Sequence, residues 1–132
     1  GYTMIFVSNR NRWGTESELA DQYEFINYCS KELNISSKVI TIGMSCGGMM
    51  SVLLAAKYPD CIEALYIDAP VMNFLSCPYS LGEGHDDSQQ EFEDATGFTL
   101  VDMINYRNHP VDNVPKLLEN NIFVFIASVD KA

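Results

Sequence analysis

The chain has 132 residues, of which 47% are hydrophobic, and this length suits a single domain spanning 1–132 with a sizeable core. Eighteen acidic residues against eight basic ones give a net charge of −10, which repels phosphate backbones and argues against a nucleic-acid partner. No run approaches the about 20 apolar residues of a bilayer-spanning helix, so no membrane partner is expected. The start at Gly1 rather than Met leaves room for a removed export signal, and the compartment is not predicted.

Strand and helix signals alternate from the beginning of the chain. Residues 2–7 are apolar and rich in β-formers, which predicts a buried strand, and a polar loop follows over 8–14. Apolar residues then recur at helical spacing over 18–33, with Thr15 or Ser17 available to cap the start of the helix.

The same alternation continues through the centre of the chain. β-Branched residues at 38–42 predict a second strand, which leads through a glycine-rich turn into an apolar helix over 49–58. Further strands are predicted at 62–67 and 121–127. The expected fold class is therefore α/β, with a mostly parallel sheet of about four strands flanked by helices.

The connection between the third and fourth strands is unusually long. Residues 72–120 exceed what a crossover requires, and such segments usually cover a site, so we interpret them as a lid-like insert within the domain. Short helices are predicted near 88–95, 100–105 and 114–120. The polar loop over 82–87 carries carboxylates that we expect to be solvated rather than to bind a metal.

Residues 43–47 read Gly-Met-Ser-Cys-Gly and fit the pattern G-x-S-x-G between a strand and a helix. Ser45 is then a nucleophile on a sharp turn, in a strained conformation that costs about 1–3 kcal/mol. Small residues at 43 and 47 keep side chains apart across the turn, and the N–H of Cys46 faces a developing oxyanion. The alternative is an incidental serine in a glycine-rich turn of a flavodoxin-like or nucleotide-binding domain, although neither phosphate-binding glycine motif is present.

The residues around this turn resemble the α/β-hydrolase superfamily, close to bacterial hydrolases of prolyl-oligopeptidase and carbohydrate-esterase type. The likeness is carried by 43–48, 55–60, 65–78 and 108–113, and it extends over nearly all of the chain. That group usually has arginine where this chain has Cys46. The resemblance implies a central fragment of the fold, without the outer strands or the loop that supplies a second oxyanion donor.

The resemblance also implies a catalytic acid after the last predicted strand. The matching turn is 127–130, which makes Asp130 the expected acid of the triad. Asp68, at the end of the third strand, is the alternative acid, because some members place it there.

The catalytic histidine is the missing part of this pattern. In the superfamily it follows the acid, whereas His85 and His109 both precede Asp130 and are interpreted as loop or packing residues. General-base help contributes about 10²–10⁴-fold, so the isolated chain is expected to turn over little or no substrate.

The sequence therefore predicts a serine hydrolase that acts on a small-molecule ester without a metal or organic cofactor. A serine peptidase and a non-catalytic α/β interaction module stay open as alternatives. Exposed strand edges leave a homo-oligomer open as well. No C-x-x-C pair is present, and we expect reduced thiols at the four cysteines Cys29, Cys46, Cys61 and Cys77.

Overall fold

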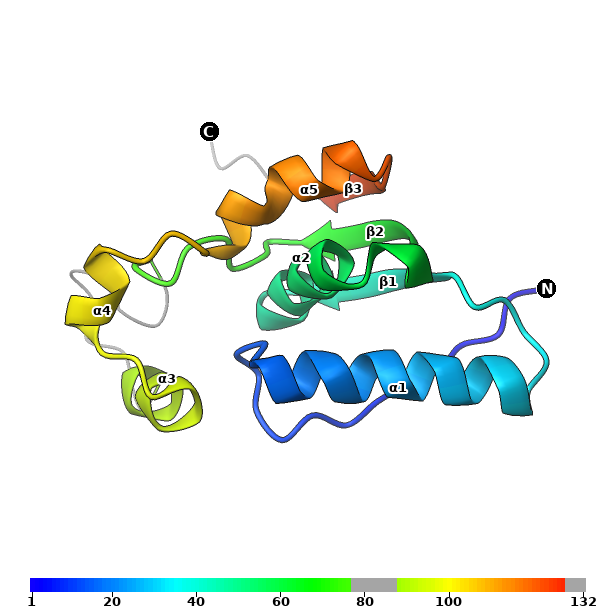
Figure 1. Cartoon of the computed structure of the whole chain (residues 1–132), viewed down its shortest axis with the longest axis horizontal. Helices are drawn as coiled ribbons and strands as arrows, with labels where there is room; N and C mark the ends of the chain where they lie inside the picture. Colours follow the sequence, from blue (N-terminus) through cyan, green and yellow to red (C-terminus); the bar gives the residue numbers. More distant parts are fainter. Residues whose placement is uncertain (77–87, 128–132) are drawn as a thin grey trace.

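The computed structural model describes residues 1–76 and 88–127 of the chain. Three strands are connected by helices, and the longest connection joins the second strand to the third (Figure 1). The elements are α1 (Glu16–Glu32), β1 (Val39–Met44), α2 (Cys46–Lys57), the 3₁₀ turn η1 (Pro59–Cys61), β2 (Ile62–Asp68), α3 (Ser88–Thr96), α4 (Leu100–Ile104), the 3₁₀ turn η2 (Pro110–Asn113), α5 (Val114–Glu119) and β3 (Phe123–Ala127). Every predicted helix is confirmed to within a few residues, as are three of the four predicted strands.

The three strands form one parallel sheet in the order β1–β2–β3. Asp68 of β2 pairs with Met44 of β1 on one side and with Ala127 of β3 on the other. The carboxyl ends of all three strands therefore lie at the same edge of the sheet. This arrangement confirms the α/β fold class.

The strand predicted over residues 2–7 is wrong, because no strand forms there. Tyr2, Met4 and Phe6 are exposed, while Ile5 packs against the core. A strand is held by hydrogen bonds to a neighbouring strand, and none of the described strands pairs with this segment. In the described residues the sheet accordingly has three strands rather than about four.

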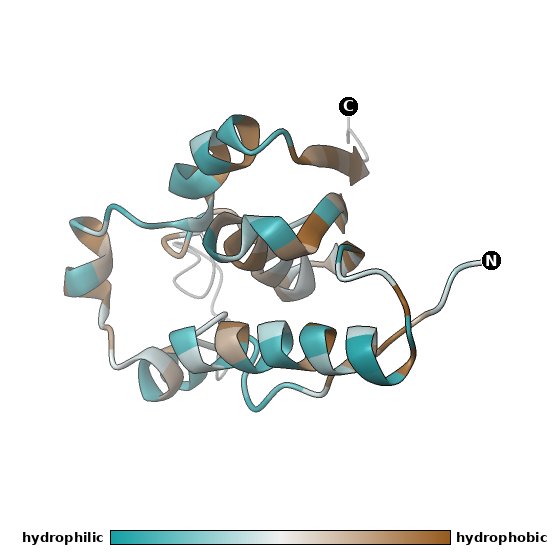
Figure 2. Cartoon of the chain, turned by 45° about the vertical axis from the view of Figure 1, so that its right-hand side comes forward, coloured by the Kyte–Doolittle hydropathy of each residue, from teal (hydrophilic) through white to brown (hydrophobic). Residues whose placement is uncertain are grey.

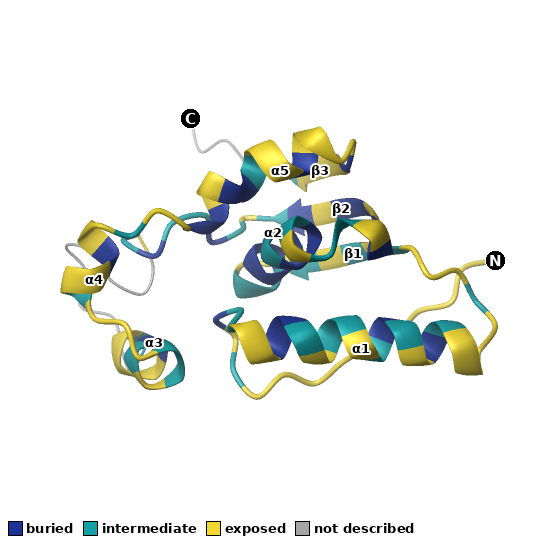
Figure 3. Cartoon of the chain, viewed as in Figure 1, coloured by how far each residue is buried: buried dark blue, intermediate teal, exposed yellow. Residues whose placement is uncertain are grey.

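The two faces of the sheet differ in their cover. Helix α2 packs on β1 and β2, and α1 and α5 lie on either side of α2 (Figure 1). Leu65 and Ile67 of β2 point to this face and are fully buried. On the opposite face Ile42 and Tyr66 lie side by side and stay exposed. Both β1 and β2 accordingly carry exposed stretches along the ribbon (Figure 3), and the ribbon of β3 is hydrophobic throughout (Figure 2).

Local sequence explains the two long helices. α1 has acidic residues in its first turn and Lys31 in its last, as the helix dipole favours, and it buries one apolar face. α2 is built from Met, Leu and Ala and is buried along much of its length, which suits a helix enclosed between a sheet and two other helices. Pro59 follows it and begins η1.

Apolar side chains gather in two clusters. The sheet-side cluster consists of Leu19, Ile26, Val52, Leu54, Ala55, Cys61, Ile62, Leu65, Ile67, Leu117 and Ile122. The site-side cluster consists of Trp13, Met49, Met50, Val71, Phe74, Phe92 and Met103. Helices α3 and α4 lie beyond the carboxyl ends of β1 and β2 (Figure 1), so the second cluster joins that region to α2. Among the described helices, none has both the length and the apolarity to cross a membrane.

Candidate active site

Ser45 stands alone between the last residue of β1 and the first residue of α2. Its backbone has φ 51° and ψ −119°, a left-handed conformation that a serine adopts only at a cost of about 1–3 kcal/mol. Its N–H donates to the carbonyl of Asp68 at 2.9 Å, which ties the turn to the end of β2. Its carbonyl accepts from the N–H groups of Met49 at 3.1 Å and Val71 at 3.2 Å. Ser45 is exposed, so a rigid, strained turn presents its side chain to solvent.

Two glycines make this turn sterically feasible. A Cβ at Gly43 would lie 2.3 Å from the carbonyl oxygen of Gly47, so any side chain there would collide with the backbone of α2. A Cβ at Gly48 would lie 2.8 Å from the side chain of Pro70. At Gly47, by contrast, an added Cβ would meet nothing within 4 Å. The expected role of a small residue is thus found at 43 but not at 47, and sequence reasoning missed Gly48.

Cys46 is the first residue of α2, where backbone N–H groups have no partner within the helix. Its thiol is free and half-buried. Burial raises the pKa of the thiol, while the charge of Arg12 and a hydrogen bond with Ser45 act in the opposite direction. Cys46 therefore carries a neutral thiol at neutral pH, and its backbone N–H is positioned next to Ser45.

The comparison with known families agrees with this geometry. Residues 8–101 match the family model of the alpha/beta hydrolase fold. The chain belongs to this family. The matched span runs from the loop before α1 into α4, so it includes both Ser45 and Asp68, and membership indicates hydrolase activity in general terms. No curated protein matches the chain.

Of the two candidate acids, only Asp68 lies within the described residues. Asp68 is the last residue of β2 and is half-buried beside Met44, the residue before Ser45. Asp130 lies outside the described residues. The strand that precedes it, β3, runs parallel to β2 and ends at the same edge of the sheet as the Ser45 turn.

His109 is a packing residue, as the sequence suggested. It is buried, and its Nδ1 accepts a hydrogen bond from the N–H of Phe74 at 3.2 Å. Its ring packs on the rings of Phe74 and Tyr106, and the backbone N–H of His109 donates to the carboxylate of Asp112. The Nδ1 lone pair therefore holds the backbone after β2 in place. His85 lies outside the described residues.

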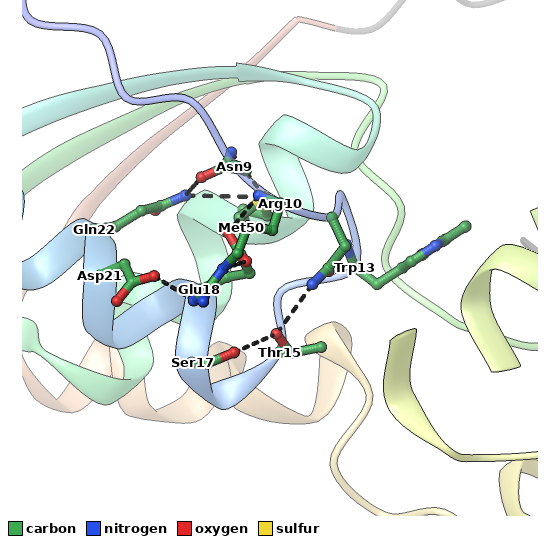
Figure 4. Close-up of polar contacts among 10 residues, drawn as sticks. Asn9, Arg10, Trp13, Thr15, Ser17, Glu18, Asp21, Gln22 and Met50 are labelled. Carbon is green, nitrogen blue, oxygen red and sulfur yellow. Dashed lines mark hydrogen bonds and ion pairs between the residues drawn. The ribbon is translucent and has the colours of Figure 1, made fainter. Parts of the chain in front are cut away.

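The loop over residues 8–14 lies beside α1 and α2 and is fixed by polar contacts (Figure 4). Arg10 pairs with Glu18 at 3.0 Å and also with Asp21, although Glu18 itself is almost fully buried. The side chain of Asn9 donates to the sulfur of Met50 and accepts from Gln22. Hydrogen bonds from both α1 and α2 thus hold this loop, and the sequence offered no signal for these partners.

Arg12 and Trp13 connect the same loop to α3. Arg12 forms an ion pair with Glu91 at 2.6 Å, and its guanidinium lies over the ring of Trp13. Trp13 is buried and meets the ring of Phe92 edge-on. Trp13 is thus a core residue. Glu91 was missed, because its partner lies 79 positions away in the chain.

The remaining predictions divide between the described and undescribed parts of the chain. Within residues 1–76 and 88–127, no group of histidine, cysteine and carboxylate side chains could hold a metal ion. The polar loop over 82–87 lies outside those residues, as does Cys77. Cys29, Cys46 and Cys61 are free thiols. Among the aromatic residues between β2 and β3, Phe74 is buried in the site-side cluster and Phe98 is partly exposed.

Proposed function

We propose that this chain is a serine hydrolase that acts on an ester, with Ser45 as the nucleophile. The observation that carries the proposal is the backbone of Ser45, with φ 51° and ψ −119°, at an exposed turn from a central strand into a helix. Strain of this size at a serine persists where surrounding structure enforces it, and such outliers cluster at active sites. Membership of the hydrolase family supports the same assignment.

The reaction follows from the groups around the turn. The oxygen of Ser45 attacks the ester carbonyl carbon, and the carbonyl oxygen becomes an oxyanion that accepts a hydrogen bond from the N–H of Cys46. The general base takes the proton of the Ser45 hydroxyl during the attack and returns it to the departing alkoxide, which leaves as the alcohol. Water, deprotonated by the same base, then cleaves the acyl-enzyme to the carboxylic acid and free Ser45. Asp130 is our proposed orienting acid, with Asp68 as the alternative at the end of β2. The base would be a histidine. His109 does not suit that role, because its ring is buried and its Nδ1 accepts a hydrogen bond from the backbone N–H of Phe74.

A fluorophosphonate probe tests whether Ser45 is an activated nucleophile. We expect the probe to add to Ser45, as measured by intact mass and peptide mapping, and the Ser45→Ala variant to stay unmodified. The matched control is Ser51→Ala, because Ser51 lies in α2, the helix that follows Ser45, and its hydroxyl donates to the carbonyl of Gly47. This variant should still be labelled.

External base extends the same test. If the proton acceptor is what limits reactivity, imidazole in the buffer should accelerate the labelling of Ser45, since general-base help is worth about 10²–10⁴-fold. A folded protein that is never labelled at Ser45, with or without imidazole, would refute the proposal and favour a non-catalytic module. Turnover of p-nitrophenyl esters against peptide anilides separates an esterase from a peptidase.

A further inference from the structure

We propose that the ion pair between Arg12 and Glu91 holds helix α3 beside the nucleophile, so that both are positioning residues of the hydrolase site. The consequence for turnover rests on the proposed function, whereas the docking of α3 does not. The proposal starts from a contact between two segments that are far apart in the chain: the loop before α1 and the helix α3 between β2 and β3.

The contact has an ionic part and an aromatic part. Nη2 of Arg12 lies 2.6 Å from Oε2 of Glu91, with both side chains about half exposed. The guanidinium carbon of Arg12 lies 5.1 Å from the centre of the Trp13 ring. That ring meets Phe92, the neighbour of Glu91, edge-on at 5.3 Å between centroids. The ion pair therefore closes the solvent side of a buried aromatic contact.

The same contact reaches the nucleophile through Cys46. The side chain of Cys46 packs against the site-side cluster, to which Trp13 and Phe92 belong. The charges of Arg12 and Glu91 are both close enough to Cys46 to influence its thiol. Because Cys46 directly follows Ser45, a shift of α3 would change the packing around Cys46, next to the reactive hydroxyl of Ser45.

The physical character of the pair suits a reversible contact. Exposed ion pairs contribute little to global stability and weaken as salt rises. Trp13 and Phe92 share apolar packing with Phe74, which persists at any salt concentration. We therefore expect the ion pair to adjust how closely α3 docks, without deciding whether the protein folds.

Trp13 is the only tryptophan in the chain, so its fluorescence reports this contact directly. In Arg12→Gln and Glu91→Gln we expect emission to shift to the red and acrylamide quenching to increase. The docked-to-undocked ratio should fall by about fivefold at most, as for an exposed pair. The charge swap Arg12→Glu with Glu91→Arg should restore the wild-type emission, and added salt should move the wild type toward the single variants.

A second ion pair on the same scaffold provides the control. Lys57, at the carboxyl end of α2, pairs with Glu16 at the start of α1. Swapping these two charges should leave Trp13 emission and its salt dependence unchanged. Unchanged emission in both single variants at Arg12 and Glu91, or failure of their swap to restore it, would overturn the proposal.

Kinetics then separate positioning from packing. With an ester substrate and imidazole as the external base, Arg12→Gln should raise KM more than it lowers kcat, and the charge swap should recover KM. Red-shifted emission with an unaltered KM would refute the positioning role while leaving Ser45 as nucleophile. If Ser45 of the wild type is never labelled by the fluorophosphonate, with or without imidazole, the proposed function fails, and the fluorescence of the variants still decides whether the pair holds α3.

Discussion

The sheet-side and site-side clusters are both apolar, but they are assembled differently. The sheet-side cluster is largely aliphatic and comes mainly from regular strands and helices, with Leu65 and Ile67 of β2 fully buried at its centre. The site-side cluster is rich in aromatic residues and methionine, and much of it comes from loops and short helices. Aliphatic side chains on regular elements pack into a rigid scaffold, whereas methionine and aromatic rings fill irregular space.

Backbone hydrogen bonds hold the strained turn, although two of the partners of Ser45, Met49 and Val71, belong to the site-side cluster. Ser45 is held by backbone hydrogen bonds to Asp68, Met49 and Val71, all within or next to the β1–α2–β2 unit. Helix α3, by contrast, is held by the exposed ion pair of Arg12 with Glu91 and by ring contacts of Phe92. A stable scaffold can store local strain, and the less regular region beside it is free to shape a substrate site.

The largest expected effect compares the centres of the two clusters. Leu65→Ala should lower the free energy of unfolding by about 2–5 kcal/mol, because it leaves a cavity in the sheet-side cluster. Phe92→Ala should instead loosen α3 locally, since Phe92 contacts Trp13 and Phe74 rather than the sheet. In urea, the Trp13 signal of Phe92→Ala should change before the far-UV circular dichroism. Coincident transitions in both variants would mean that the clusters unfold as one unit.

The next largest effect compares two glycines of the Ser45 turn, Gly43 and Gly47. Gly43→Ala should cost about 3 kcal/mol, because its Cβ would lie 2.3 Å from the backbone oxygen of Gly47 and overpack the turn. Gly47→Ala is the matched control, since its Cβ meets nothing within 4 Å and alanine favours a helix by about 0.5–1 kcal/mol. Urea denaturation of both variants measures the difference. Equal destabilisation would show that the turn tolerates neither side chain.

The smallest expected effect concerns the capping box of Thr99 and Asp102 at the start of α4. The carboxylate of Asp102 accepts hydrogen bonds from the N–H and the hydroxyl of Thr99, and these lower its pKa. A carboxyl whose folded-state pKa is depressed stabilises the fold above the unfolded value of about 3.9. That contribution is lost as pH falls through the lower folded-state pKa. The protection factors of the α4 amides, which correct for the intrinsic pH dependence of exchange, should therefore fall in acid, but not in Asp102→Asn; equal acid dependence of the protection factors in both proteins would contradict this role.

Local sequence patterns predicted most of the helices and strands and the turn at Ser45. Helical periodicity located α1, and β-branched residues located β1, because both signals depend on neighbours within a few positions. The G-x-S-x-G motif located Ser45 for the same reason. The run at 2–7 failed as a strand, because the same residues can be extended without a partner.

The sequence by itself determined the α/β order of elements, the strained turn at Ser45 and the need for glycine at 43, since each depends on backbone conformation over a few residues. Only the tertiary structure decided which partners meet across the chain. Glu91 on Arg12, Glu18 on Arg10 and Pro70 against Gly48 are pairs of this kind. A local pattern records what a segment prefers, whereas these contacts arise when the sheet brings its loops to one edge and packing excludes the alternatives.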